Sequence, residues 1–410
     1  MGGVSMEWKE VRLGDIVSIK SGLAYKGAFI GKGENILLGM GCVSFKDKFL
    51  FSGARPYEAD CDDKYCVEPG DIVLATRQQS DNLPILAMPA IIPSSLKAKK
   101  IIYGTNLYKV ENHSEVTNDF LFWQLKTPDY IDYISSVKTG SVVRMVTKKN
   151  VEDYVFRCPP KEVRDRISKL LWGLDRKIEL NNKINADLEE MAQAIFKNWF
   201  VDFEPFKDGK FVDSELGMIP EGWKVGTLKD LLYLRKDGIK AANKGNLPYL
   251  PIDTIPMHCL VATDFKSNDE AKSSLQTFEQ NDIVVGAMRV YFHRVILAPC
   301  KGITRTTCFV LSVKNENALA YSLMQCNQDE AISFAEKTSK GSTMPYAVWD
   351  GGYGEYKVVI PPDEVMKSLN DLLGNFFSKM NKNAIENSRL SLLRDTLLPR
   401  LMSGEIEIPE

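Results

Sequence analysis

The sequence predicts an α+β protein made of two similar mixed α/β modules and two long helices that form an antiparallel coiled coil, with a pseudo-twofold internal repeat. Three observations predict this fold. The motif Pro-Pro-Lys-Glu-Val at 159–163 recurs 202 residues later as Pro-Pro-Asp-Glu-Val at 361–365. Apolar residues at spacings of three and four follow both copies, and no insertion interrupts either copy. So narrow a stripe is typical of a coiled-coil seam rather than of a globular-core helix.

The length of 410 residues favours two domains, because a single core rarely grows so large. We expect a first module at 1–158, a first long helix at 159–204, a second module at 205–360, and a second long helix with a C-terminal tail at 361–410. A composition of 44% hydrophobic and 26% charged residues is ordinary for a folded protein. The chain has no apolar run of about 18 residues, and its start lacks a signal-peptide core, so a cytoplasmic protein without membrane contact is expected.

The repeat continues into the modules with a drifting register. Asp71-Ile72 matches Asp282-Ile283, and Gly140-Ser141 matches Gly341-Ser342, while the offset falls from 216 near the module start to 201 at the Gly-Ser pair. The second module therefore carries net deletions that the helices do not. We expect strands at 71–75, 90–92, 282–286 and 307–313, because these runs are β-branched and follow turn residues. Helices are expected at 118–125 and 318–326.

The ends of the long helices are marked by proline and glycine. Pro160 and Pro362 can open helices, because the first helical position needs no amide partner. The first helix should end at about Trp199. The second should end at about Leu398, before Pro399. Each would then be on the order of 50 to 60 Å long at 1.5 Å per residue.

Chain order predicts that these helices pack antiparallel. The first helix ends where the second module begins, and the second helix begins where that module ends, and domain termini usually lie close together. Asn181 and Asn383 are equivalent in the repeat and should approach one another, because a polar seam residue fixes register. The predicted seam consists of Ile167, Leu170, Leu174, Asn181, Leu188, Met191, Leu369, Leu372, Phe376, Asn383, Leu390 and Leu393.

Cysteine and histidine spacing gives no sign of a metal site. The eight cysteines contain no CxxC pair, and the chain has only three histidines. Zinc sites need thiolates and imidazoles clustered at ligand spacing, which this chain lacks, so we interpret the cysteines as reduced, mostly buried thiols.

Two segments resemble a known family. The run Phe-Lys-Asn-Trp-Phe-Val-Asp-Phe-Glu-Pro at 196–205, followed by Gly-Met-Ile-Pro-Glu-Gly-Trp at 217–223, resembles the central region of the specificity subunits of type I restriction-modification systems. The tail Leu-Leu-Pro-Arg-Leu-Met-Ser-Gly-Glu-Ile at 397–406 resembles their C-terminal signature. The layout of the whole chain fits this resemblance.

The resemblance implies a non-catalytic DNA-recognition subunit with two target-recognition domains. Each domain would read one half of a bipartite, asymmetric site in double-stranded DNA, and the helices would set the spacer, with half-site centres about one to one and a half DNA turns apart. The helices would also dock two modification (methyltransferase) subunits and, through them, restriction subunits. The complex would methylate adenine at N6 and cleave DNA with ATP. No cofactor is expected in this subunit, because S-adenosylmethionine, ATP and Mg would belong to the partners. Self-association of the isolated subunit is left open.

Candidate DNA contacts follow from residue type and position. Base edges in the major groove are read by Arg, Lys, Asn or Gln, and cations near a turn neutralise phosphates. Each candidate has a plainer interpretation as solvated surface. In the first module the candidates are Arg77, Gln78, Gln79, Asn82, Lys97, Lys99, Lys100, Ser141, Arg144, Lys148 and Lys149. In the second module they are Arg289, Arg294, Lys301, Arg305, Lys337, Lys340 and Ser342. The recurrence of the Gly-Ser turn beside cations favours those two places.

The aromatic residues Trp199, Phe200, Phe203 and Phe206 allow two interpretations. They either pack against the second module or form a landing surface for a modification subunit.

Two rival classes of function are weaker, an enzyme that acts on DNA by itself and a structural scaffold. An amino-methyltransferase would carry Asp or Asn before Pro-Pro, where this chain has Cys158 and Ile360. A metal-dependent nuclease could use Asp264, Glu270 and Lys272, but the first module lacks a copy of them. A scaffold that binds only proteins would leave the divergent polar loops without a use.

Overall fold

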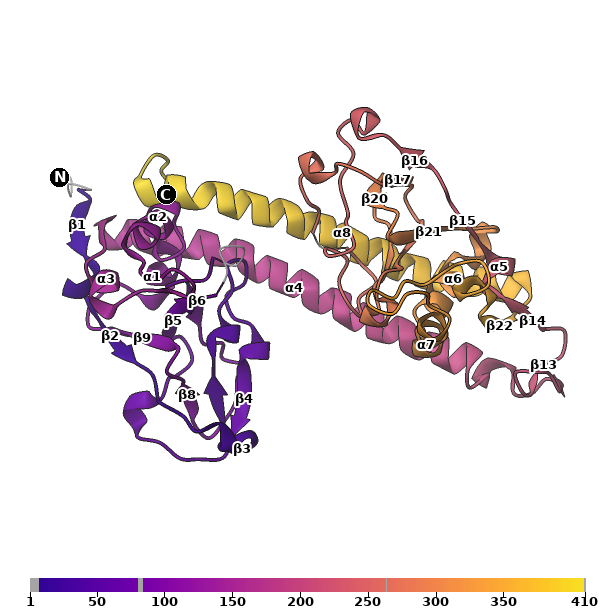
Figure 1. Ribbon diagram of the computed structural model, residues 1–410, viewed down its shortest axis with the longest axis horizontal. Coiled ribbons are helices and arrows are strands. Elements are labelled where there is room, and N and C mark those ends of the chain that lie inside the picture. The colour runs from indigo at the N-terminus through magenta and orange to yellow at the C-terminus, as the bar shows by residue number, and fades with distance from the viewer. Residues whose placement is uncertain (1–6, 80–83, 263, 409–410) are drawn as a thin grey trace. The chain divides into compact units, whose positions relative to one another are not determined.

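The computed structural model describes residues 7–79, 84–262 and 264–408. The chain divides into two compact units: unit 1 is Met1–Leu174 with Leu393–Glu410, and unit 2 is Asp175–Leu392. Both boundaries between the units fall inside the two long helices, α4 (Lys161–Phe200) and α8 (Asp363–Ser403), drawn in magenta and yellow in Figure 1. Each unit therefore contains one segment of each helix.

Unit 1 is built on a four-stranded sheet of order β2-β9-β5-β7, a three-stranded sheet of order β4-β3-β8, and the pairs β1-β11 and β6-β10. Its strands are β1 (Lys9–Arg12), β2 (Val17–Ser21), β3 (Ile30–Leu38), β4 (Ala54–Tyr57), β5 (Ile72–Ala75), β6 (Arg77–Gln78), β7 (Pro89–Ile91), β8 (Ile101–Tyr103), β9 (Leu107–Asn112), β10 (Arg144–Met145) and β11 (Val155–Cys158). Its short helices are α1 (Asn118–Gln124), α2 (Pro128–Val137) and α3 (Lys148–Glu152).

Unit 2 has a four-stranded sheet of order β15-β21-β18-β19, a three-stranded sheet of order β16-β17-β20, and the pairs β14-β22 and β12-β13. Its strands are β12 (Phe211–Val212), β13 (Ile219–Pro220), β14 (Lys224–Thr227), β15 (Leu232–Leu234), β16 (Gly238–Ile239), β17 (Leu275–Phe278), β18 (Ile283–Gly286), β19 (Val295–Leu297), β20 (Gly302–Arg305), β21 (Cys308–Val313) and β22 (Lys357–Ile360). Its short helices are α5 (Leu228–Leu231), α6 (Leu319–Cys326) and α7 (Asp329–Lys337).

The strand orders confirm the internal repeat. In each unit the four-stranded sheet places the first strand beside the last, and the two middle strands follow, all antiparallel. The three-stranded sheets differ, because β3 pairs with β8 in parallel whereas β17 pairs antiparallel with both neighbours. The deletions that shift the register of the repeat thus coincide with divergence outside the four-stranded sheets.

The turn before the central strand shows how the repeat survives substitution. Gly70 has φ +90° and the equivalent Asn281 has φ +70°. Asparagine is among the few non-glycine residues that tolerate this left-handed conformation. The following aspartates, Asp71 and Asp282, accept from the amides of Glu68 and Glu279 at 2.9 and 2.7 Å, which closes the same turn in both units.

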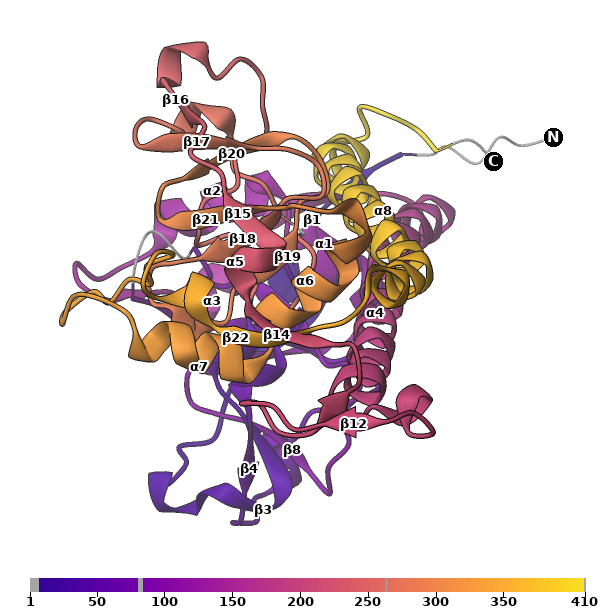
Figure 2. The same ribbon diagram turned by 90° about the vertical axis from the view of Figure 1, so that its right-hand side faces the viewer.

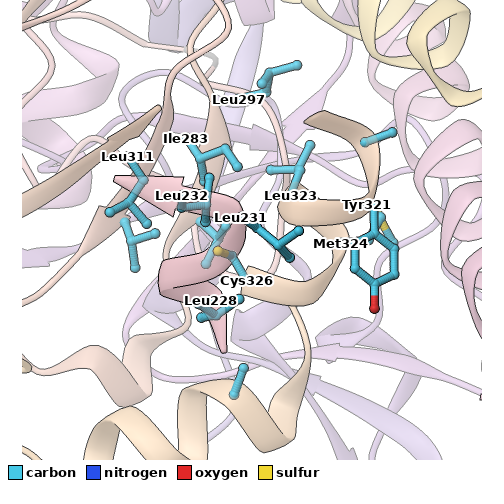
Figure 3. Packing of buried hydrophobic residues seen from close by; sticks show 14 of the residues in the cluster. Leu228, Leu231, Leu232, Ile283, Leu297, Leu311, Tyr321, Leu323, Met324 and Cys326 are labelled. Atoms are coloured by element: carbon cyan, nitrogen blue, oxygen red, sulfur yellow. The ribbon is translucent and has the colours of Figure 1, made fainter. Parts of the chain in front are cut away.

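The core of unit 2 lies between its four-stranded sheet and the helices α5 and α6, whose arrangement can be followed in Figure 2. Leucines of α5 meet Leu323 and Met324 of α6, with Ile283 and Leu311 of the sheet close by (Figure 3). Unit 1 has the corresponding core around α1, with Phe120, Leu121 and Phe122 fully buried. No helix among the described residues combines the length and the apolar character that crossing a membrane requires.

Each end of α4 packs into a different core. In unit 1 the ring of Trp172 lies 5.5 Å from that of Trp123 in α1. In unit 2 the ring of Phe200 lies 4.9 Å from that of Tyr321 in α6. Burial of such large rings, rather than helix propensity, holds a helix of this length in place.

The two long helices pack antiparallel within unit 2, as predicted. The amide of Asn181 donates to Asn387 at 2.9 Å, and Asn383 donates to Asn185 at 2.8 Å, so partners descend in α8 as residue numbers rise in α4. Asn181 and Asn383 are both buried. Contrary to the prediction, they do not form a hydrogen bond with one another. Each pairs instead with the asparagine four residues beyond the other: Asn181 with Asn387, and Asn383 with Asn185. Asn185 and Asn387 are themselves equivalent in the repeat, so the local pseudo-twofold relation falls between the two pairs.

The predicted seam is rotated by about one residue. Ile167, Asn181, Leu369 and Asn383 are buried, but Met191, Leu372 and Leu393 are exposed by 51%, 39% and 46%. The residues that directly follow Leu170, Met191, Leu372 and Phe376 are buried instead: these are Leu171, Ala192, Leu373 and Phe377. Leu393 has no buried neighbour in sequence, since Leu392 is 70% exposed and Arg394 is half-buried. Leu170, Leu174, Leu188, Phe376 and Leu390 are half-buried. The physical reason is that the helices also pack on the globular cores, which bury a broader and rotated face.

The prediction that Pro399 ends the second helix was wrong. Helix α8 continues through Pro399 to Ser403, and Gly404 follows with φ +77°. A proline inside a helix loses one hydrogen bond. Leu398, Leu401 and Met402 are buried in the core of unit 1, and that packing outweighs the loss. The helix starts at Lys161 and Asp363 follow the opening prolines as expected.

Candidate nucleic-acid interface

Each unit carries a tight hairpin at its Gly-Ser pair, residues 139–145 in unit 1 and 340–346 in unit 2, hereafter the Gly-Ser hairpins. Thr139 and Met145 exchange two backbone hydrogen bonds of 2.9 Å, and Lys340 and Tyr346 do the same. Gly140 and Gly341 have φ +91° and +89°, a region that glycine enters without strain. The sequence repeat thus becomes a repeated piece of backbone geometry.

Each Gly-Ser hairpin lies beside the segment that follows the central strand of its own unit. Met145 pairs with Arg77, which comes just after β5. In unit 2 Tyr346 bridges to Met288, and the amide of Arg289 donates to the carbonyl of Pro345 at 2.8 Å. The hairpin and the arginine segment are thus neighbours in space, although about 65 residues separate them in the first unit and about 55 in the second. The sequence predicts these two regions separately as DNA contacts.

Arg77 and Arg289 are exposed beside these hairpins. Among the residues that the structure describes, neither makes an ion pair. The phenol of Tyr108 lies near Arg77; burial raises the pKa of Tyr108, and the arginine charge partly opposes that shift. A guanidinium in this position can donate to phosphate oxygens or to guanine in the major groove.

The hairpin tips also expose apolar side chains that the sequence prediction missed. In unit 1 Val142 is 83% exposed, with Val143 and Met145 also exposed. In unit 2 Met344 and Tyr346 are exposed. Tyr291, two residues after Arg289, is exposed as well. The sequence did contain a sign of this exposure. The apolar residues Val142 and Val143 directly follow Gly-Ser and are not part of a strand or helix pattern that would bury them. Apolar side chains can contact the thymine methyl group.

Five candidates are engaged within the protein. Gln78 is buried, and its carbonyl oxygen accepts from the amide of Leu86 at 3.2 Å. Lys100 pairs with Asp60 and Asp63 at 2.9 and 3.0 Å; these hydrogen bonds raise the pKa of Lys100 and lower that of Asp60. Arg144 donates to the carbonyl of Gly140, Lys301 pairs with Glu279, and Arg294 donates to the carbonyls of Ile252 and Ile255. Their first role is structural.

The other candidates divide by location. Ser141, Ser342 and Lys340 belong to the Gly-Ser hairpins, while Lys148 and Lys149 begin α3 just after one hairpin and Lys337 ends α7 just before the other. Gln79 is exposed beside Arg77. Lys97 and Lys99 precede β8, and Arg305 ends β20, so these three are attached to the three-stranded sheets. Asn82 lies outside the described residues.

The aromatic residues at the end of α4 pack within unit 2. Phe200 is buried, and the rings of Phe203 and Phe206 lie 5.6 and 4.9 Å from that of Trp223. Trp199 is half-buried against Phe200 and Phe206. Packing against the second module, the first of the two interpretations, therefore accounts for most of the area of these four aromatic side chains.

Comparison with known proteins points to one family. Residues 6–190 match the family model for the type I restriction modification DNA specificity domain. The chain is 27% identical over 310 residues to the MjaIX specificity subunit of Methanocaldococcus jannaschii, covering 72% of this chain and 70% of that protein. It is 23% identical to the HindI specificity subunit of Haemophilus influenzae, covering 98% and 100%.

A solved structure shares the fold. The type I restriction-modification S subunit from M. genitalium aligns with a TM-score of 0.57 over 98% of both chains, at 14% identity. Residues 6–190 thus match a type I restriction modification DNA specificity domain, and the chain as a whole is similar in sequence and fold to the specificity subunits of type I restriction-modification systems.

Proposed function

We propose that each unit reads one half of a bipartite DNA site through its Gly-Ser hairpin and the adjoining arginine, Arg77 or Arg289. The observation that carries this proposal is the repeated geometry with altered side chains. Both hairpins have the same backbone bonds and the same neighbouring segment, but Val142 and Val143 of unit 1 are replaced by Thr343 and Met344 in unit 2. A constant frame with different tips is what two different half-sites require.

Charge supports contact with the DNA backbone around these tips. Lys148 and Lys149 follow one hairpin, and Lys337 and Lys340 precede or begin the other. Each lysine that neutralises a phosphate releases a counterion, so the affinity should fall steeply with salt concentration. These contacts would position the subunit, and the hairpin tips would supply sequence preference.

Helices α4 and α8 would set the spacer and dock two modification subunits, which carry S-adenosylmethionine and methylate adenine. Restriction subunits that use ATP and Mg would join through them. This subunit would need no cofactor for reading DNA, and its work on cellular DNA would place it in the cytoplasm. Exposed apolar side chains on the helices, Leu180 and Met191 three turns apart on α4, support the docking role.

The reading function is tested by mapping methylation sites of the reconstituted complex. Arg77→Ala should relax or change one half-site only, and Arg289→Ala the other only, with about 1–3 kcal/mol lost at the affected base pair if the arginine reads a base. If the arginine contacts only phosphate, affinity should fall for all sequences and the salt slope should drop by about one. Arg157→Ala, an exposed arginine of β11, is the matched control. Loss of both half-sites from one substitution would refute the assignment of one half to each unit.

Docking is tested by co-purification with the modification subunit. Met191→Glu should abolish or strongly weaken the complex, whereas Val155→Glu should not, since both side chains are 51% exposed but only Met191 lies on a long helix. Equal binding by both variants would remove α4 at this position from the docking surface.

A further inference from the structure

Two of the three histidines in the chain face one another in unit 2. The rings of His258 and His293 lie 4.5 Å apart between centroids, although 35 positions separate them in sequence. His258 belongs to the long connection between β16 and β17, and His293 follows the 3₁₀ turn Val290–Phe292. Asp329, the first residue of α7, stands beside them, and the ligand atoms of the three side chains lie within 4.8 Å of one another.

The hydrogen bonds of His293 determine which nitrogen carries the proton. Its Nε2 lies 2.9 Å from the side-chain oxygen of Asn327 and 3.1 Å from the backbone carbonyl oxygen of the same residue, and both oxygens can only accept. Nε2 must therefore be the N–H of the ring. In the neutral ring this leaves a bare lone pair on Nδ1.

A carboxylate oxygen lies close to Nδ1. Nδ1 of His293 is 3.2 Å from a carboxylate oxygen of Asp329, and His293 is only 5% exposed. The separation is close to the edge of a tetrahedron with metal–ligand bonds of about 2.0 Å, which is about 3.3 Å.

The surroundings have two further features of metal sites. Ligand histidines usually donate their other N–H to a backbone carbonyl, as His293 does, which fixes the tautomer and ring orientation. Both histidines also have left-handed backbones, with φ +50° at His258 and +48° at His293. Non-glycine residues are held there at a cost, and such residues concentrate at functional sites.

A cavity of about 810 Å³ borders the three side chains and is lined also by Gln193, Lys197 and Tyr356. It gives an ion a path of entry. It also leaves room for water at a fourth position, as expected where the protein supplies three ligands.

We propose that His258, His293 and Asp329 form a binding site for one divalent transition-metal ion, of which zinc is the best fit to two imidazoles and a carboxylate. The ion would take Nδ1 of His293 and a carboxylate oxygen of Asp329 as two of its ligands. It is bound by unit 2 alone and does not depend on the proposed reading of DNA.

The position of the site suggests what the ion stabilises. Arg289 lies four residues before His293, and α7 runs from Asp329 to Lys337, just before the hairpin at 340–346. The ion would tie together the two segments that carry the candidate DNA contacts of unit 2. The connection at His258 would be tied to them too, and it also contacts α4, because the amide of Leu260 donates to Glu189 at 3.2 Å.

The experiment is a metal titration of the full chain after dialysis against a chelator. Co²⁺ should bind at one ion per chain with the visible absorption of a tetrahedral site, and Zn²⁺ should displace it. His258→Ala and Asp329→Asn should each weaken Zn²⁺ binding at least tenfold. Both side chains are exposed, so both variants should keep the wild-type circular dichroism spectrum.

Matched controls come from the same chain. His113→Ala removes the third histidine, which is exposed in unit 1, and Glu330→Gln removes the carboxylate next to Asp329. Both should bind Zn²⁺ within twofold of the wild type. Absence of bound metal in the wild type would overturn the proposal. Equal binding by wild type and both site variants would overturn it by placing the metal elsewhere. Neither result bears on half-site recognition, which is measured separately by methylation mapping.

Discussion

Asn181 is fully buried at the centre of the helix pair, where a leucine would be the ordinary choice. Its amide donates to Asn387 at 2.9 Å and to Glu386 at 2.8 Å, and its oxygen accepts from Lys177. The hydrogen bond from Asn181, and that from Lys177, whose Nζ lies 3.3 Å from the carboxylate of Glu386, lower the pKa of Glu386. Buried amides lose free energy unless they are paired, so the four asparagines Asn181, Asn185, Asn383 and Asn387 select the register in which all of them have partners.

Replacing Asn181 by alanine should therefore destabilise the protein by about 1–3 kcal/mol, because Asn387 would be left buried with a lost partner. Urea unfolding of Asn181→Ala, Asn387→Ala and the double variant measures the coupling, which we expect at about 0.5–3 kcal/mol. Asn198→Ala, exposed on the same helix, should change the free energy of unfolding by less than about 0.5 kcal/mol. Strict additivity of the two central substitutions would contradict a specific bond between them.

Among the elements, the Gly-Ser hairpins combine a rigid backbone with exposed tips. Their geometry depends on glycine unequally. A β-carbon at Gly140 would lie 2.1 Å from the carbonyl oxygen of Val143, whereas one at Gly341 would lie 3.2 Å from that of Met344. The first contact is impossible without a backbone shift, and the second needs only a small one.

Gly140→Ala should consequently lower the free energy of unfolding more than Gly341→Ala does. At Gly140 the left-handed conformation and the clash together should lower it by about 1–3 kcal/mol. Thermal unfolding monitored by fluorescence compares the two. Binding of Gly140→Ala to DNA should also weaken, because the tip of the hairpin would move. Gly27→Ala, which has open space around its α-carbon and no left-handed φ, serves as the control. Equal costs at Gly140 and Gly341 would show that the hairpin adapts.

For the whole molecule, the important feature is that both boundaries between the units fall inside α4 and α8. These helices belong to both units, and each segment is buried in the core of its own unit. A change in helix length must therefore be transmitted to both units. This is the physical basis for the proposed spacer.

Inserting one heptad into both helices, after Lys183 and after Ala384, should lengthen the accepted spacer by about three base pairs, because seven residues add about 10.5 Å along a helix and each base pair adds about 3.4 Å. A heptad keeps the buried face in phase. Methylation-site mapping gives the spacer directly. The same seven residues inserted between Asp208 and Gly209, outside both helices, should leave the spacer as it is. An unchanged spacer in the helix variant would refute the role of the helices as a ruler.

The sequence by itself determined the repeat, the antiparallel pairing and the family, because these depend on periodicity and on motifs that are local in the chain. It also placed the turn at Gly70 and Asn281 and the Gly-Ser pairs, since backbone conformation there follows from residue type.

Only the tertiary structure decided which face of each helix is buried and that α8 passes through Pro399, because packing against the two cores outweighs the local preference. It likewise decided that Gln78, Lys100 and Arg294 serve the fold, as their partners come from distant segments. The meeting of His258 with His293 and Asp329 has no counterpart in sequence spacing. Ligand geometry there is made by three separate segments, and only folding brings them within reach of one ion.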